Sequence, residues 1–174
     1  MLHSSKQLFV FPILLAVSLL AGCSQTQAPV KPTVVPDQDM IGAIHAAGDR
    51  EKSVIDVNPL RDPGVSALQD AAKNDEQAGR YADAAVKLDQ ALKLSPDSPD
   101  LLQDRAEIAI RLKDFAGAER FAHQSWSLGP KLGPLCARNW QTIVEMRLQA
   151  GDEAGADTAR KWVPHCHKAG VPRY

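Results

Sequence analysis

Three cysteines and a pair of histidines are the side chains of this sequence best suited to chemistry. Cys136 and the triplet His165-Cys166-His167 together offer thiols and imidazoles. Such groups either bind zinc or, in an oxidising compartment, join two thiols in a disulfide. Adjacent residues of an extended segment point in opposite directions, so the triplet is poorly placed to give three ligands to one tetrahedral ion. We therefore predict no metal site. A disulfide is the favoured interpretation, and unpaired thiols are the third.

No catalytic motif accompanies these residues. The sequence has no nucleophile elbow, no paired-histidine helix, no glycine-rich phosphate loop and no calcium-binding loop. Its carboxylates fall mostly on helical faces and at turns, where solvation explains them. We predict that the protein is not an enzyme and has neither catalytic residues nor a cofactor.

The charge balance argues against a polyanionic partner. The chain has 174 residues and a formal net charge of -1, without a cluster of lysines and arginines. Nucleic acid and anionic lipid both require a concentrated positive field, so we predict no nucleic-acid partner. Abundant alanine and other strong helix formers, without long runs of alternating β-branched residues, predict an all-α fold.

Residues 1–22 have the organisation of a secretory signal peptide. A short polar start containing Lys6 precedes an apolar run over residues 8–20, which Pro12 interrupts. The run is too short for a stable membrane span, because a helix needs about 20 apolar residues to cross the hydrocarbon core. We expect these residues to be removed from the mature protein.

The signal ends in Leu20-Ala21-Gly22-Cys23, which resembles the lipobox of bacterial lipoproteins. Small residues before the cysteine let a peptidase approach the bond, and a thiol is a strong nucleophile for capturing a lipid. The resemblance implies that Cys23 is lipidated and that several acyl chains anchor the protein. An ordinary cleaved signal followed by a chance cysteine is the alternative. By resemblance to Gram-negative lipoproteins, Ser24 directs the protein to the periplasmic face of the outer membrane.

Two stretches further along are degenerate copies of one pattern. Residues 79–96 align with residues 113–130, so that Pro96 matches Pro130 at a spacing of 34 residues. This period, with matching turn and alanine positions, resembles the tetratricopeptide repeat, a helix-turn-helix hairpin. The resemblance implies an α-solenoid of stacked hairpins.

A third, more degenerate hairpin follows. Its turn at Gly151 comes four residues later than the period requires, and we assign the excess to residues 131–134. The repeat domain is predicted to span residues 61–168 and to contain about three hairpins, which is the minimum for a stable stack. Residues 169–174 are predicted to be a tail.

Residues 23–60 are predicted to be a lipidated, partly disordered tether. Its first part, residues 24–37, is polar and interrupted by prolines, as in extended linkers. Residues 39–47 have the spacing of a short helix with Met40 and Ile44 on one side. Two interpretations stay open for this second part: a loosely ordered linker, or a segment packed on the first repeat.

The hairpin assignment also relates two of the cysteines. It places Cys136 at the start of one helix and Cys166 just beyond the end of its antiparallel partner. Both then lie at the same end of one hairpin, where their Cα atoms can meet disulfide geometry. Such a bridge would stabilise the domain by roughly 3 to 4 kcal/mol on the chain-entropy model.

By resemblance, the first helix of each repeat lines a concave surface that binds peptides or other proteins. The family's groove positions correspond here to Gln69, Lys73, Gln77, Gln103, Glu107, Arg111, Arg138, Gln141 and Glu145. They depart from the carboxylate-clamp set of chaperone-binding members, and their mixed charges suit a polar, mixed-charge segment of a protein. A solvated helical face explains each of them equally well.

The resemblance implies a lipid-anchored periplasmic scaffold that recruits a protein or peptide partner, as pilotins and adaptors of cell-wall enzymes do. The alternative is a structural lipoprotein that associates with itself into a homo-oligomer. No capping helix follows the last hairpin, so Trp162 is expected to expose apolar surface that a second copy could cover.

Overall fold

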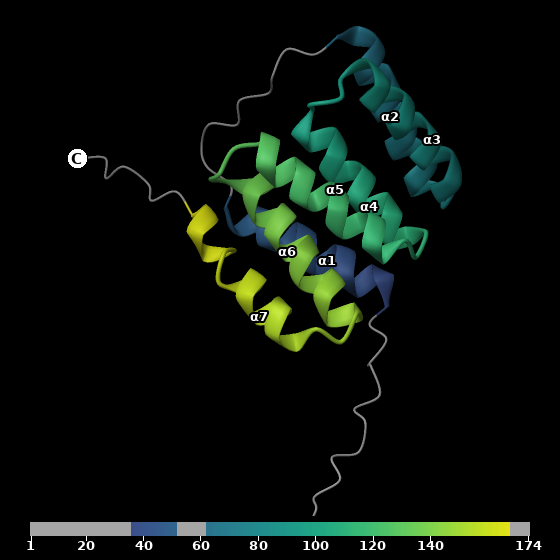
Figure 1. The fold of residues 1–174 in the computed structure, drawn as a ribbon. Coiled ribbons are helices and arrows are strands. Elements are labelled where there is room, and N and C mark those ends of the chain that lie inside the picture. Colours follow the sequence, from purple (N-terminus) through teal and green to yellow (C-terminus); the bar gives the residue numbers. More distant parts are fainter. Residues whose placement is uncertain (1–35, 52–61, 168–174) are drawn as a thin grey trace, which may run out of the picture. The chain divides into compact units, whose positions relative to one another are not determined.

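The structure, a computed structural model, describes residues 36–51 and 62–167, which form α-helices and one 3-10 turn (Figure 1). The predicted signal peptide (1–22), the predicted lipidation site Cys23 and the predicted tail (169–174) lie outside these residues. Within the described ranges, no helix is both long enough and apolar enough to cross a membrane.

Six of the helices pair into three consecutive hairpins. The hairpins are α2 (Pro63–Gln77) with α3 (Tyr81–Leu94), α4 (Pro99–Arg111) with α5 (Phe115–Leu128), and α6 (Pro134–Gln149) with α7 (Glu153–Arg160). Contacts of α3 with α4 and of α5 with α6 join each hairpin to the next. The all-α solenoid predicted from the sequence is confirmed.

The same turn chemistry closes all three hairpins. Each turn has one residue in the left-handed region: Gly79 at φ 74°, Lys113 at φ 64° and Gly151 at φ 77°. Glycine adopts this conformation freely, whereas a residue with a Cβ pays about 1 kcal/mol. In the second and third turns, Asp114 and Asp152 then cap the next helix by accepting a backbone N–H. These local signals explain why the period is visible in the sequence.

Small residues let the helices approach closely. The fully buried alanines are Ala84, Ala91, Ala106, Ala109, Ala118, Ala122, Ala137, Ala156 and Ala159. Larger side chains such as Leu101, Ile108 and Ile143 fill the space between the helix backbones and are equally inaccessible to water. The buried hydrophobic residues form three clusters: one in the first hairpin and α4, one beneath α1, and one that centres on α6.

The third hairpin corrects two details of the sequence-based prediction. The sequence has four extra residues before the third turn, which we assigned to residues 131–134. α6 has 16 residues, whereas α4 has 13. Most of the extra residues therefore lengthen a helix and not a loop. Pro134 opens α6, where its missing N–H costs no hydrogen bond. α7 has only eight residues and ends at Arg160. The returning helix is thus short, and Trp162 lies in the turn beyond it.

A further helix, α1 (Asp37–Arg50), lies in the segment predicted as a tether. Its apolar residues Met40, Ile41, Ile44 and Ala47 are buried, because α1 packs mainly against α6 and also contacts α4 (Figure 1). The folded domain thus begins before the predicted boundary at residue 61. Of the two interpretations, the packed segment is right, but α1 packs on the second and third hairpins rather than on the first.

Candidate functional site

A groove remains open between α1 and α2. The first helices of the hairpins, α2, α4 and α6, present one surface, and α1 covers its α4 and α6 part. The uncovered part is a groove of about 450 Å³. It is lined from α2 by Gln69, Ala72, Lys73, Glu76 and Gln77, from α3 by Leu88, from α4 by Asp104, Glu107 and Ile108, from α1 by His45, Gly48 and Asp49, and from α6 by Pro134 and Arg138.

Five of the nine residues predicted for partner binding line this groove: Gln69, Lys73, Gln77, Glu107 and Arg138. The side chains of Lys73 and Gln77 are exposed on α2. Gln69 is buried, and its Nε2 donates a hydrogen bond to Asp104 at 2.6 Å. The structure therefore brings the predicted residues of the first repeat to the open part of the surface.

Two other predicted residues, Gln103 and Arg111, are engaged by the chain itself. Gln103 is fully buried and donates hydrogen bonds to Glu107 and to Thr142, both at 2.9 Å. The Arg111 side chain is 12% exposed, and its guanidinium lies 3.9 Å from the carboxylate of Asp37 on α1. No partner can reach Gln103 in this conformation, and α1 already occupies the surface beside Arg111.

The remaining two predicted residues, Gln141 and Glu145, pair with each other along α6. Gln141 donates a hydrogen bond to Glu145 at 2.7 Å. Glu145 is buried, and this burial raises the pKa of its carboxyl. Neither residue belongs to the lining of the open groove.

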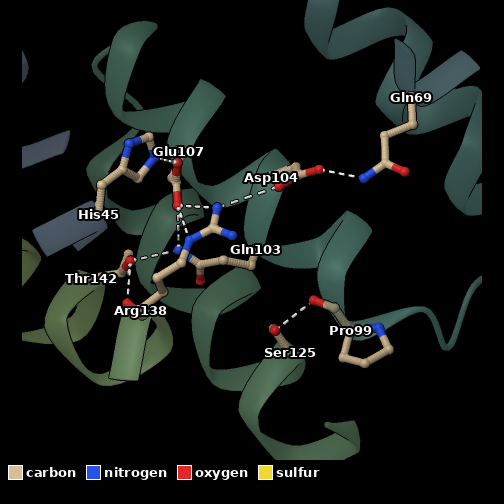
Figure 2. A network of polar contacts seen from close by, with 9 residues as sticks. All are labelled: His45, Gln69, Pro99, Gln103, Asp104, Glu107, Ser125, Arg138 and Thr142. Carbon is tan, nitrogen blue, oxygen red and sulfur yellow. Dashed lines mark hydrogen bonds and ion pairs between the residues drawn. The ribbon is translucent and has the colours of Figure 1, made fainter. Parts of the chain in front are cut away.

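Glu107, one of the residues that line the groove, is the centre of a polar network (Figure 2). The Nε2 atom of His45, on α1, lies 2.7 Å from Glu107 Oε2, and the guanidinium of Arg138 donates to Glu107 Oε1 at 2.7 and 3.1 Å. Burial opposes ionisation of this carboxyl, but Arg138 and His45 together lower the pKa of Glu107 to about 2. Glu107 is thus a carboxylate that fixes α1 to α4 and α6.

Asp104 is a second groove carboxyl, and the sequence-based prediction missed it. It accepts hydrogen bonds from Gln69 at 2.6 Å and from Arg138 at 3.4 Å (Figure 2). Burial raises the pKa of Asp104 despite the neighbouring Arg138. The period gave no signal for this pair, because the four extra residues of the third hairpin put Asp104 and Arg138 at non-equivalent positions of their repeats.

Close approach of α1 to α6 depends on Gly48, which the sequence did not single out. A Cβ at this position would lie 2.9 Å from Cγ of Arg138 and 3.3 Å from the carbonyl oxygen of Pro134. A side chain here would push Arg138 away from its carboxylate partners. Gly48 therefore belongs to the construction of the groove wall.

A disulfide joins Cys136 to Cys166 at the C-terminal end of the domain, with the Cα atoms 5.6 Å apart. The backbone N–H of Gly133 also donates to the carbonyl of Cys166 at 2.7 Å. With both sulfurs in a disulfide, the alternative zinc site lacks its thiolates. In the part of the chain that the structure describes, no group of three or more potential metal ligands comes together.

An aromatic cluster lies beside this disulfide. Trp162 stacks on Trp140 with ring centroids 5.4 Å apart, and Trp126 meets the same ring edge-on at 5.1 Å. Trp162 remains 45% exposed. The three rings border an apolar pocket of about 340 Å³.

Comparison with known proteins places the chain among helical repeat proteins. The family model described as tetratricopeptide repeat matches residues 76–131. The globular C-terminal domain of P. aeruginosa LpoP is similar in structure, with a TM-score of 0.55 and 30% sequence identity, over 60% of this chain and 98% of that one. No curated protein matches the sequence. The chain therefore spans nearly the whole of a known globular domain of this kind.

Proposed function

Because the chain belongs to the tetratricopeptide-repeat family, whose members serve as protein-interaction scaffolds, we propose that it is a non-catalytic, lipid-anchored adaptor on the periplasmic face of the outer membrane. Its groove between α1 and α2 binds a segment of a protein partner. The partner belongs to an envelope complex, in a role like that of a pilotin or of an adaptor of a cell-wall enzyme.

The open groove is the observation that carries the proposal. It combines an apolar floor, formed by Ala72, Leu88 and Ile108, with polar walls that include the exposed side chains of Lys73 and Gln77. Apolar floors supply affinity, and a few placed polar groups supply orientation. A peptide segment with both kinds of side chain matches this lining.

Lipid anchoring rests on the residues around Cys23, which lie outside the described part of the chain. A Cys23→Ala variant removes the acyl acceptor. It should leave the outer-membrane fraction and appear in the soluble periplasm, whereas a Ser24→Ala variant should stay anchored. Retention of the Cys23→Ala protein in the membrane would contradict the anchor.

The groove is tested by photo-crosslinking in cells from a benzophenone amino acid at Gln77. We expect this position to capture a discrete partner, and a Lys73→Trp variant, which fills the groove, to abolish the crosslink. Lys93→Trp on the exposed face of α3 is the matched control and should leave capture intact. Failure of position 77 to capture any protein, or capture that survives Lys73→Trp, would refute the groove as a partner site.

The exposed face of Trp162 favours a second candidate function, self-association. The apolar pocket beside it could receive a side chain from another copy. Sedimentation of the purified protein at high concentration distinguishes the two. Oligomers that a Trp162→Ala substitution dissociates would support self-association, and a monomer at all concentrations would exclude it.

A further inference from the structure

We infer that the partner segment inserts a lysine or arginine side chain into the groove, beside Glu76 and between α1 and α2. This inference rests on the proposed function and specifies the chemistry of its ligand. Two observations support it: the charged residues that line the groove, and the hydrogen bonds and ion pairs that these residues make within the chain.

The described lining residues have more acids than bases. The carboxylates are Asp49, Glu76, Asp104 and Glu107, and the permanent cations are Lys73 and Arg138. Asp49 also has an interaction outside this set. The other three carboxylates still outnumber the two permanent cations, so the lining has a surplus of acidic groups when His45 is neutral. A cationic group entering it is attracted, and an anionic one is repelled, at a site partly shielded from solvent.

Within this set, Glu76 is the carboxylate that lacks a matching group. Glu107 is held by His45 and Arg138, and Asp104 by Arg138 and Gln69. Among the residues that the structure describes, the Glu76 carboxylate has neither a hydrogen-bond donor nor an ion-pair partner, although it is half-buried. A charge-assisted hydrogen bond from a partner would stabilise such a half-buried carboxylate, because the chain itself does not supply that bond.

The electrostatics of Glu76 agree with this assignment. Burial and the nearby charge of Glu107 raise the pKa of the Glu76 carboxyl, although the charges of Arg111 and His45 act against this rise. A bound ammonium or guanidinium would relieve both effects by pairing with the carboxylate. The arrangement resembles that of Glu107, which faces the same groove and is ionised because cations already surround it.

The walls fit the rest of such a side chain. Lysine and arginine bury an aliphatic stem while keeping the charged end in a polar environment. The apolar floor of Ala72, Leu88 and Ile108 can receive the stem, and Glu76 lies on the wall that α2 forms. α1 supplies the opposite wall through His45, Gly48 and Asp49, so this helix is part of the recognition site.

The test measures the yield of the crosslink from position 77 in full-length variants expressed in cells. Glu76→Gln should reduce the yield about tenfold, as expected for loss of one charge-assisted hydrogen bond, and Glu76→Lys should abolish it. Asp70→Asn, the same neutralisation at an exposed position of α2, is the matched control and should have no effect.

Mass spectrometry of the captured peptide gives an independent readout, and we expect a lysine or arginine within a few residues of the crosslinked position. An unchanged yield in folded Glu76→Gln and Glu76→Lys variants would overturn the inference. That result would leave the adaptor function standing, since that proposal fails only when position 77 captures no partner or when capture survives Lys73→Trp.

Discussion

Replacing Ile44 by alanine tests whether α1 is an integral part of the domain. Ile44 is fully buried, in a core cluster that also contains Ala109, Ile110 and Met146. Truncation of a buried isoleucine to alanine typically costs about 2 to 5 kcal/mol, from lost transfer free energy and from the cavity left behind. Ile44 lies between packed helices that cannot easily collapse around the cavity, so we expect the free energy of unfolding to fall by about 3 kcal/mol.

The assay is urea denaturation followed by circular dichroism and by tryptophan fluorescence. Fluorescence reports on Trp140, which shares a core cluster with Ala47 of α1. For a domain of this size, a loss of about 3 kcal/mol lowers the melting temperature by roughly 10 °C. The matched control is Ala46→Gln, an exposed position of α1, which should change stability by less than about 0.5 kcal/mol.

Equal unfolding free energies for the wild-type protein and the Ile44→Ala variant would refute this reasoning. α1 would then be detached in solution, and the surface of α4 and α6 would be free along its whole length. Hydrogen exchange distinguishes local from global effects. Faster exchange confined to α1 in the variant would mean that α1 undocks as a separate unit, whereas uniform acceleration would mean that the domain unfolds with it.

Three further predictions concern pH, a turn and the disulfide. The hydrogen bond to Glu107 raises the pKa of His45 above 6.5, so its stabilisation is complete below that pH and is lost as the pH rises through the raised pKa. The stability difference between wild type and His45→Gln should therefore be largest below pH 6.5 and shrink as the pH rises above it, and a constant difference would contradict the pairing. The backbone of Lys113 is left-handed, a conformation that favours glycine. Lys113→Gly should therefore raise the free energy of unfolding by about 1 kcal/mol, and Lys113→Val should lower it by about the same amount. Equal melting temperatures of these variants and the wild type would disprove the strain. Replacing Cys136 and Cys166 together by serine should cost roughly 3 to 4 kcal/mol in urea denaturation, since the bridge closes a loop over a sequence separation of 30; an unchanged midpoint would show that the bridge does not form.

The solenoid was predictable because its signals are local. Gly79 and Gly151 adopt the left-handed turn conformation that their residue type favours, and Pro96 and Pro130 close successive units at the family period. Such features depend on a few neighbouring residues and recur, so one copy supports the interpretation of the next. Residues 131–134 show what the repeat period cannot predict. The period indicates how many residues are extra, but it does not indicate whether they lengthen a loop or a helix.

The position of α1 could not be predicted in the same way. The apolar spacing of Met40 and Ile44 indicates a helix with one buried side, but the pattern does not specify which surface it meets. That surface belongs to α4 and α6, far along the chain. His45 and Glu107, which pair across this contact, are 62 residues apart. Gln103, a position predicted for the groove, is also part of the interior, where it bonds to Glu107 and to Thr142 of α6.

The docked helix changes what the groove can recognise. Had α1 been a loose tether, the concave surface would present Gln103, Glu107, Arg111 and Arg138 to a partner as a broad surface of mixed charge. With α1 in place, Arg111 is paired with Asp37 of α1, in addition to the pair that Arg138 makes with Glu107 of α4, and the opening that remains is narrower. α1 thus both reduces the binding surface and builds one wall of it. A soluble version used for binding studies must therefore begin before residue 37, because removing α1 would expose the buried network around Glu107 and take away the wall opposite α2.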